Sequence, residues 1–252
     1  MGNSACCKTD KYKRTPHLLY HFKPFDSRLW LLNPDIEKNN EVQCINLTLD
    51  RSLFPQNMKD ALSQTTTFTI AGYETISNTK GCIYMIGGME LRGGHLTTNE
   101  SKTNFASNMR HSVYQETSKY SQNAVPSDLV ACVDLNKINK DNECNVYVLG
   151  RLPRPRTSHT LALDPKRKHI YIVGGMENYI PTQTCLKYDL NNNTIFYIDP
   201  IPDNITLTKP ASLVVGNCLY VFDCYSVNQS IYKYNIEYEF WERVIIRTKG
   251  SF

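Results

Sequence analysis

Apolar and polar residues alternate with a period of two along most of this chain, and long runs of helical periodicity are absent. The alternation is regular from residue 157 onward. It predicts four strands, at Ser158 to Leu163, His169 to Val173, Cys185 to Leu190 and Ile195 to Ile198. Turn-forming residues separate the first two strands at 164–168 and the last two at 191–193. The pattern indicates a sheet unit of four consecutive strands.

The same order of strands recurs after this unit and before it. The later unit has predicted strands at Ala211 to Val215, Cys218 to Phe222, Ser230 to Ile236 and Phe240 to Ile246. The earlier unit has them at Thr66 to Ile70, Gly81 to Ile86, Leu129 to Leu135 and Cys144 to Leu149. Two further stretches, Leu29 to Asn33 and Val42 to Leu49, resemble the last two strands of a partial unit. The chain is therefore expected to be all-β.

Short segments of the chain are near copies of one another. The segment Ile83 to Glu90 reads IYMIGGME and returns at Ile170 to Glu177 as IYIVGGME. A third copy, LYVFDC at Leu219 to Cys224, begins 49 residues after the second and lacks the glycine pair. Self-similarity with a period near ~50 residues marks a repeat architecture. Function in such proteins is expected to lie in a surface.

The strand order and its punctuation resemble the kelch repeat of β-propellers, over roughly residues 64 to 250. The residues that match the kelch motif are Gly87, Gly88, Gly174, Gly175, Tyr188, Phe196, Tyr234 and Trp241. Arg156 and His159 also match an Arg and a His that often precede the first strand. The resemblance implies a structural role for all of them: the glycines turn the chain sharply beside a neighbouring backbone, and the aromatic rings pack between adjacent blades.

The resemblance divides the chain into a tail and an incomplete propeller. Residues 1–24 form a basic tail, and residues 25–252 form the kelch-like part, made of a partial blade (25–63) and three four-stranded blades (64–150, 151–203 and 204–250). A closed ring needs ~4–8 blades, and about three and a half are visible. We therefore expect an incomplete or open ring. The interpretations left open are a fragment or reduced gene product, a ring completed by another chain, and a ring that stays open.

One blade carries a long insertion at residues 91–127, rich in Ser, Thr, Asn and Lys and without clear periodicity. A tolerated surface loop explains it, because loops absorb insertions at small entropic cost. The alternative is a partner-binding or phosphorylated arm, since the segment contains many hydroxyl side chains.

Composition places the chain in the cytoplasm. Hydrophobic residues make up 41% of it, and the formal net charge of +4 is too small to indicate nucleic-acid binding. The nine cysteines form no CxxC pair, which predicts reduced, buried thiols and neither a disulfide framework nor a zinc site. No apolar stretch approaches ~18 residues, and the amino terminus has no apolar core of a signal peptide.

The amino terminus, MGNSACCK, resembles the start of a dually acylated protein. Removal of Met1 would expose the amine of Gly2 for myristoylation, and Cys6 and Cys7 would take palmitate. Position six carries Cys where the myristoylation pattern has Ser or Thr, so the match is imperfect. Basic residues at positions 8–14 would add attraction to an anionic leaflet. The hypothesis is a lipoprotein bound peripherally to the cytosolic face of a membrane; the alternative is a chance grouping of Gly and Cys.

Nothing in the sequence indicates catalysis. The six histidines show no metal-binding spacing on a rigid element, and GxGxxG, P-loop and GxSxG motifs are missing. We expect no metal and no cofactor. Three arginines, Arg151, Arg154 and Arg156, cluster in the linker before a predicted first strand. Because guanidinium groups match carboxylates and phosphates, these arginines are the candidate partner-binding residues.

The sequence thus predicts a non-catalytic kelch-type scaffold that binds a protein partner through loops on one face. Two alternatives stay open. One is a substrate-receptor subunit of a ubiquitin ligase, although the chain has no recognisable BTB or F-box segment. The other is a propeller enzyme of galactose-oxidase type, although its Tyr, His and Cys constellation is not found here. The sequence predicts neither the partner's identity nor an oligomeric state.

Overall fold

The protein is all-β. The computed structural model describes residues 19–22, 28–32, 42–49, 72–77, 81–91, 124–224 and 230–244. Within these ranges every regular element is a strand except one 3-10 turn, Leu135–Lys137, which Asp134 caps by accepting a hydrogen bond from the Asn136 amide. The strands fall into two compact units, one made of residues 1–73, 89–125 and 133–148 and the other of 74–88, 126–132 and 149–252.

The first unit contains an antiparallel meander of three strands, β1 (Leu19–Phe22), β2 (Arg28–Leu32) and β3 (Val42–Leu49). The sequence predicts β2 and β3, and β1 precedes them. Strand β3 continues the sheet by pairing in parallel with β8 (Glu143–Arg151), with Asn46 opposite Glu143. The core residues Leu29, Ile45 and Leu47 are fully buried, as the alternation in these strands predicts.

Strands β4 (Gly72–Ser77), β5 (Cys82–Leu91), β7 (Leu129–Asp134) and β8 follow the sheet order β8-β7-β5-β4, and the short β6 (Ala124–Pro126) pairs with β5. Three of the four strands predicted here, all except the first, are confirmed. The predicted first strand, Thr66 to Ile70, lies outside the described residues, and β4 stands in the following stretch. Residues 92–123 of the predicted insertion also lie outside the described residues.

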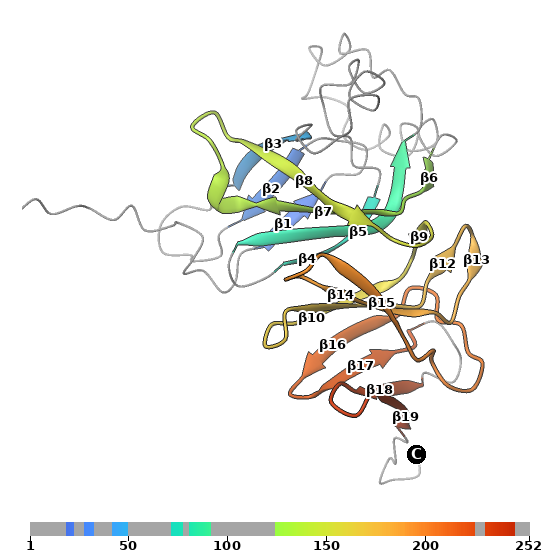
Figure 1. Ribbon diagram of the computed structural model, residues 1–252. Coiled ribbons are helices and arrows are strands. Elements are labelled where there is room, and N and C mark those ends of the chain that lie inside the picture. Colours follow the sequence, from blue (N-terminus) through green and yellow to red (C-terminus); the bar gives the residue numbers. More distant parts are fainter. Residues whose placement is uncertain are drawn as a thin grey trace, which may run out of the picture. The chain divides into compact units, whose positions relative to one another are not determined.

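The second unit contains two four-stranded antiparallel sheets whose strands match the predicted ones closely (Figure 1). One sheet has the order β10 (Thr160–Asp164), β11 (His169–Val173), β14 (Cys185–Asp189) and β15 (Thr194–Ile198). The other has the order β16 (Ala211–Val215), β17 (Cys218–Phe222), β18 (Ile231–Asn235) and β19 (Phe240–Val244). In each sheet the spatial order is the chain order, because every connection is a short turn between antiparallel neighbours.

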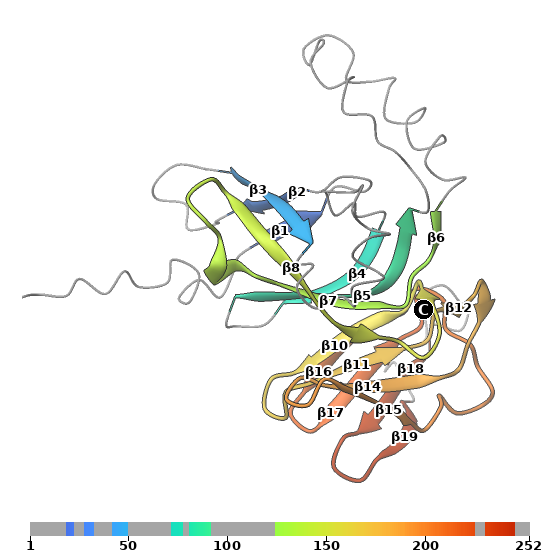
Figure 2. The ribbon, with the colours of Figure 1, turned by 45° about the horizontal axis from the view of Figure 1, so that its top comes forward.

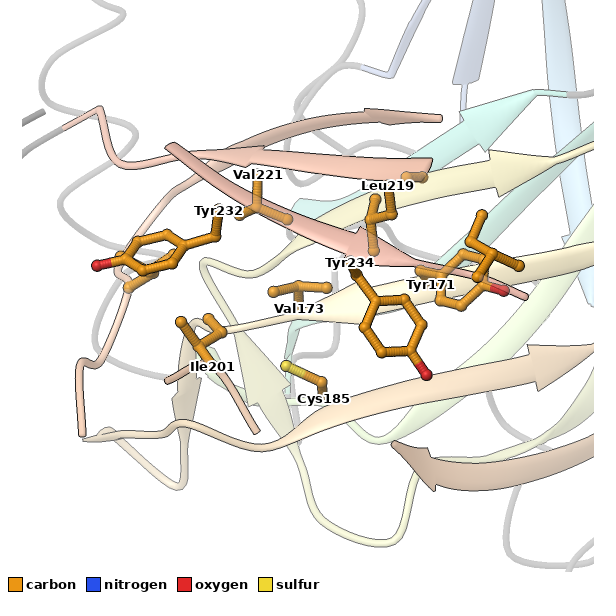
Figure 3. Close-up of a cluster of buried hydrophobic side chains, with 11 residues drawn as sticks. Tyr171, Val173, Cys185, Ile201, Leu219, Val221, Tyr232 and Tyr234 are labelled. Carbon is orange, nitrogen blue, oxygen red and sulfur yellow. The ribbon is translucent and has the colours of Figure 1, made fainter. Parts of the chain in front are cut away.

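These two sheets pack face to face (Figure 2). The cluster between them contains Tyr171, Val173 and Cys185 from the first sheet, and Leu219, Val221, Tyr232 and Tyr234 from the second (Figure 3). The opposite face of the first sheet packs against Tyr84, Ile86 and Val130 through Ile170, Ile172, Leu186 and Tyr188. Strand β11 is therefore buried on both faces, which explains its unbroken apolar sequence.

Aromatic rings fill the space between the sheets, as the sequence predicts for Tyr188, Tyr234 and Trp241. Tyr234 lies 5.0 Å from Trp241 and 6.1 Å from Tyr171, measured between ring centroids. The register, however, places Ile195 opposite Tyr188 where Trp241 lies opposite Tyr234. Phe196 points to the other face, is 49% exposed and lies under the ammonium group of Lys187. In this sheet Ile195, and not Phe196, occupies the packing position.

Candidate functional site

A small ribbon connects the linker before β10 to the segment after β11. Its three strands have the order β13 (Ile180–Pro181), β12 (Met176–Glu177) and β9 (Arg156–Thr157), with Glu177 paired to both Arg156 and Ile180. Asn178 and Tyr179 close the β12–β13 hairpin with positive φ values of 48° and 69°. Left-handed conformations at both central residues are what a two-residue hairpin turn requires.

The glycine pair before β12 brings this ribbon close to the linker. Gly175 has a φ of 85°, and a Cβ placed on it would collide with the carbonyl oxygen of Thr157 and lie 2.6 Å from the His159 amide nitrogen. Gly87, the corresponding residue of the earlier copy, has a φ of 59°, and its Cβ would lie 2.5 Å from the Arg156 carbonyl oxygen. Only glycine fits such backbone approaches, so the duplicated glycines are required by packing.

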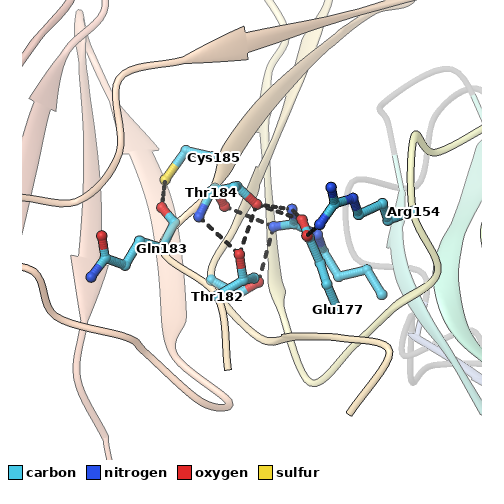
Figure 4. Close-up of polar contacts among 8 residues, drawn as sticks. Arg154, Glu177, Thr182, Gln183, Thr184 and Cys185 are labelled. Atoms are coloured by element: carbon cyan, nitrogen blue, oxygen red, sulfur yellow. Dashed lines mark hydrogen bonds and ion pairs between the residues drawn. The ribbon is translucent and has the colours of Figure 1, made fainter. Parts of the chain in front are cut away.

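Arg156 is the centre of a buried polar network (Figure 4). Its side chain is 1% exposed, and Nη1 donates to the carbonyl oxygens of Gly174 (3.1 Å) and Thr184 (2.8 Å). Nη2 donates to a carboxylate oxygen of Glu177 and to the hydroxyl of Thr184. The Thr184 hydroxyl also donates to Glu177 at 2.6 Å and lies 3.0 Å from the Thr182 hydroxyl. This guanidinium is fully engaged inside the protein.

Burial changes the protonation of the groups around this network. It lowers the pKa of the Arg156 guanidinium, and the neighbouring Glu177 carboxylate opposes that change. Burial and the positive charge of Arg156 together lower the pKa of His159 to about 3, opposed weakly by the backbone of Ile86. His159 is 2% exposed, so it is a neutral core histidine at physiological pH. Burial also raises the pKa of the nearby Cys185 thiol to about 12, which makes this cysteine unreactive.

The three arginines of the linker therefore have different environments. Arg151 is half-exposed and forms an ion pair with Asp128 at 2.5 Å. The Arg154 side chain is 69% exposed, and Nη1 lies 3.7 Å from the second carboxylate oxygen of Glu177. The structure brings Arg154 and Arg156 together around Glu177 but leaves only Arg151 and Arg154 accessible to another molecule.

The β12–β13 hairpin exposes apolar side chains beside Arg154. Tyr179 is 59% exposed and Ile180 is 69% exposed. The hairpin is held to the linker by the Asn178 amide, which donates to the Pro155 carbonyl oxygen at 3.2 Å. We call Arg154, Tyr179 and Ile180 the hairpin surface. It combines an accessible cation with two exposed apolar groups on a turn whose geometry is fixed by the ribbon.

Sequence reasoning misses the functional part played by Glu177, Thr184 and the hairpin tip. A signal for Glu177 is present, because the Met-Glu that follows the glycine pair is repeated at 89–90 and 176–177. The hairpin tip has a weaker signal in Asn178, a residue that tolerates left-handed backbone. The predicted acylation sites Gly2, Cys6 and Cys7 lie outside the described residues.

Two searches of the described residues concern other classes of site. No group of three or more His, Cys, Asp or Glu side chains within them is arranged to hold a metal ion. In the same part of the chain, no helix has the length and apolar character needed to cross a membrane.

No protein-family model matches this sequence, and a comparison with curated proteins finds none that is similar to it.

Proposed function

We propose that this chain is a non-catalytic, kelch-type β-propeller segment that binds a protein partner through the hairpin surface. Two observations support the kelch-type assignment: stacked four-stranded antiparallel sheets in chain order, and a duplicated glycine pair at the end of the second strand. The residues around the pair, Arg156 and His159, act within the fold, which leaves the exposed hairpin and linker for recognition.

The observation that carries the binding role is the hairpin itself. Tyr179 holds a left-handed backbone conformation, which is unfavourable for a bulky residue, and its side chain stays 59% exposed. Tyrosine and arginine dominate the energetics of protein interfaces, and here both accompany an exposed isoleucine. The expected partner segment presents an apolar side chain to Tyr179 and Ile180 and a carboxylate or phosphate to Arg154.

Quantitative affinity purification from the source cells tests this proposal. The bait variant carries Arg154→Glu, Tyr179→Asn and Ile180→Ser, and the matched control carries Tyr238→Asn, which alters a 72% exposed tyrosine in the β18–β19 turn. The expected result is a set of proteins that wild type and control recover and the hairpin variant loses. Identical recovery by all three baits contradicts the proposal. Cullin-type subunits among the lost proteins assign the ubiquitin-ligase alternative.

We also propose that acylation of Gly2, Cys6 and Cys7 tethers the protein to a membrane surface. Support comes from the coincidence of an N-terminal glycine, two thiols and a basic stretch, since stable anchoring needs two such signals. Cells are labelled with an alkyne analogue of myristate. Wild type is expected to take the label and Gly2→Ala to lose it; equal labelling of both proteins contradicts the tether.

A further inference from the structure

The sheet of β16 to β19 has two apolar faces, of which only one is covered. Leu219, Val221, Tyr232 and Tyr234 belong to the face that packs against the β10–β15 sheet, and all four are buried. Side chains on the opposite face come from the alternate positions of the same strands. They include Leu213, Val215, Tyr220, Phe222, Ile231 and Phe240, which the register places in adjacent rows across the four strands. We call these six residues the open face.

The open face is accessible. Leu213, Val215 and Phe240 are 44%, 54% and 41% exposed, and the other three are half-buried. A contiguous apolar surface of this kind on a sheet marks a site of association, because single exposed apolar residues are normal and adjacent rows of them are not.

The internal repeat shows what a covered face of this kind looks like. In the repeated segments Tyr220 and Phe222 of β17 correspond to Tyr171 and Val173 of β11. Tyr171 and Val173 are 1% and 0% exposed, because the β16–β19 sheet packs on them. Strand β17 has the same apolar character on both faces as β11. Its sequence is therefore that of a strand covered on both sides, although the open face carries no covering sheet among the described residues.

Charge on the open face favours a second copy of the same chain as the covering sheet. Lys233 and Glu242 lie in the row of Leu213 and Tyr220, and their side chains form an ion pair at 2.9 Å. The pair is 28% and 48% exposed, and its hydrogen bond raises the pKa of Lys233. The face thus carries one cation and one anion side by side. A two-fold axis through this row brings each Lys233 to the Glu242 of the other copy, so the face is complementary to itself.

We propose that two copies of this chain associate through the open face, sheet against sheet, about a two-fold axis. The apolar rows of the two copies pack as the sheets within one chain do, and the central charges exchange partners. The association is independent of the hairpin surface, which lies on the ribbon of β9, β12 and β13.

Sedimentation equilibrium of the full chain, repeated over a range of concentrations, gives the first test. Wild type is expected to be a dimer that dissociates on dilution. Val215→Lys places a charge on the open face at a position exposed enough to leave the fold intact, and it is expected to raise the dissociation constant at least about tenfold. Ile180→Lys, at an equally accessible position on the hairpin, is the matched control and is expected to dimerise as wild type does. A monomeric wild type, or a Val215→Lys protein as dimeric as the control, overturns the proposal.

A mixing experiment tests the two-fold axis. Lys233→Glu gives a face with two anions, and Glu242→Lys gives one with two cations, so each variant alone is expected to be monomeric. Mixed in equal amounts, the two are expected to form a heterodimer, detected by native mass spectrometry from their mass difference. Circular dichroism confirms that each variant is folded before mixing. Absence of the heterodimer, with both variants folded, overturns the proposed axis.

Discussion

Arg156 and Leu207 occupy the same position in successive repeats, and each brings its backbone carbonyl against a glycine. A Cβ on Gly87 would lie 2.5 Å from the Arg156 carbonyl oxygen, and one on Gly174 would lie 2.6 Å from that of Leu207. The side chains differ completely, although both are 1% exposed. The repeat therefore conserves a backbone contact, while its interior can be filled by a bonded guanidinium or by a leucine.

This relationship predicts an asymmetric response when the ion pair of Arg156 is broken. Glu177→Ala leaves a buried cation without its counter-ion, and we expect a loss of about 3–5 kcal/mol in the free energy of unfolding. Arg156→Met is expected to cost less, about 1–3 kcal/mol, because the remaining Glu177 keeps the Thr184 hydroxyl and has Arg154 at 3.7 Å. Urea denaturation of the two variants and wild type measures the difference. The reverse order of stability contradicts the proposed arrangement.

His159 predicts a loss of stability in acid. Its pKa is about 3 in the folded protein, where burial and Arg156 disfavour the charged ring, and about 6.5 in an unfolded chain. Between these values the unfolded chain binds a proton that the folded protein does not, so the stability is fully present above about pH 6.5 and falls as the pH decreases toward 3. The slope from this group is about 1.4 kcal/mol per pH unit.

The measurement is urea denaturation of wild type and His159→Gln at pH values from 8 to 4.5. The variant is expected to lose less stability below pH 6.5 than wild type does, while the pH dependence of both between 8 and 7 is the same. His169, whose pKa is also lowered by partial burial, contributes in the same direction in both proteins. Parallel curves over the whole range would show that His159 does not titrate differently on folding.

Three glycine variants separate backbone strain from steric contact. Gly150→Ala meets no atom within 4 Å, Gly216→Ala has open space at a φ of 59°, and Gly175→Ala combines a φ of 85° with the Thr157 carbonyl oxygen. The expected costs in free energy of unfolding are about 0–0.5, about 1–2 and at least about 3 kcal/mol respectively. Thermal or chemical denaturation gives the order, and a Gly175→Ala protein as stable as Gly216→Ala contradicts the close approach.

Cysteine reactivity checks the placement of individual thiols. Burial raises the pKa of Cys144 to about 11 and that of Cys185 to about 12, whereas Cys224 is exposed. In native protein at pH 8, iodoacetamide is expected to modify Cys224 and to leave Cys144 and Cys185 unmodified. Peptide mapping by mass spectrometry reads each site, and the same reaction in urea shows that all three thiols are reactive once unfolded. Rapid native modification of Cys185 would be incompatible with its position between the sheets.

Local sequence determines the strands of this protein with good accuracy. The bounds of β11, β16 and β17 coincide with the predicted ones, and β14 differs by a single residue. Alternation and turn residues carry this information because the pleat of a strand and the geometry of a tight turn involve only neighbouring residues. Gly175 belongs to the same class, since its pairing with a second glycine marks a sharp turn before any contact is known.

Tertiary structure alone decides which residues are available for function. Arg151, Arg154 and Arg156 look alike in the linker, but only Arg156 is buried, because Glu177 and Thr184, more than twenty residues later, lie against it. Ile195 replaces Phe196 at the packing position because pairing with β14 sets which face each side chain takes. Likewise Tyr220 is half-buried where Tyr171 is fully buried, although the two strands have similar sequences. The alternation along a strand states that a face is apolar; only the packing of other sheets determines whether that face is core or surface.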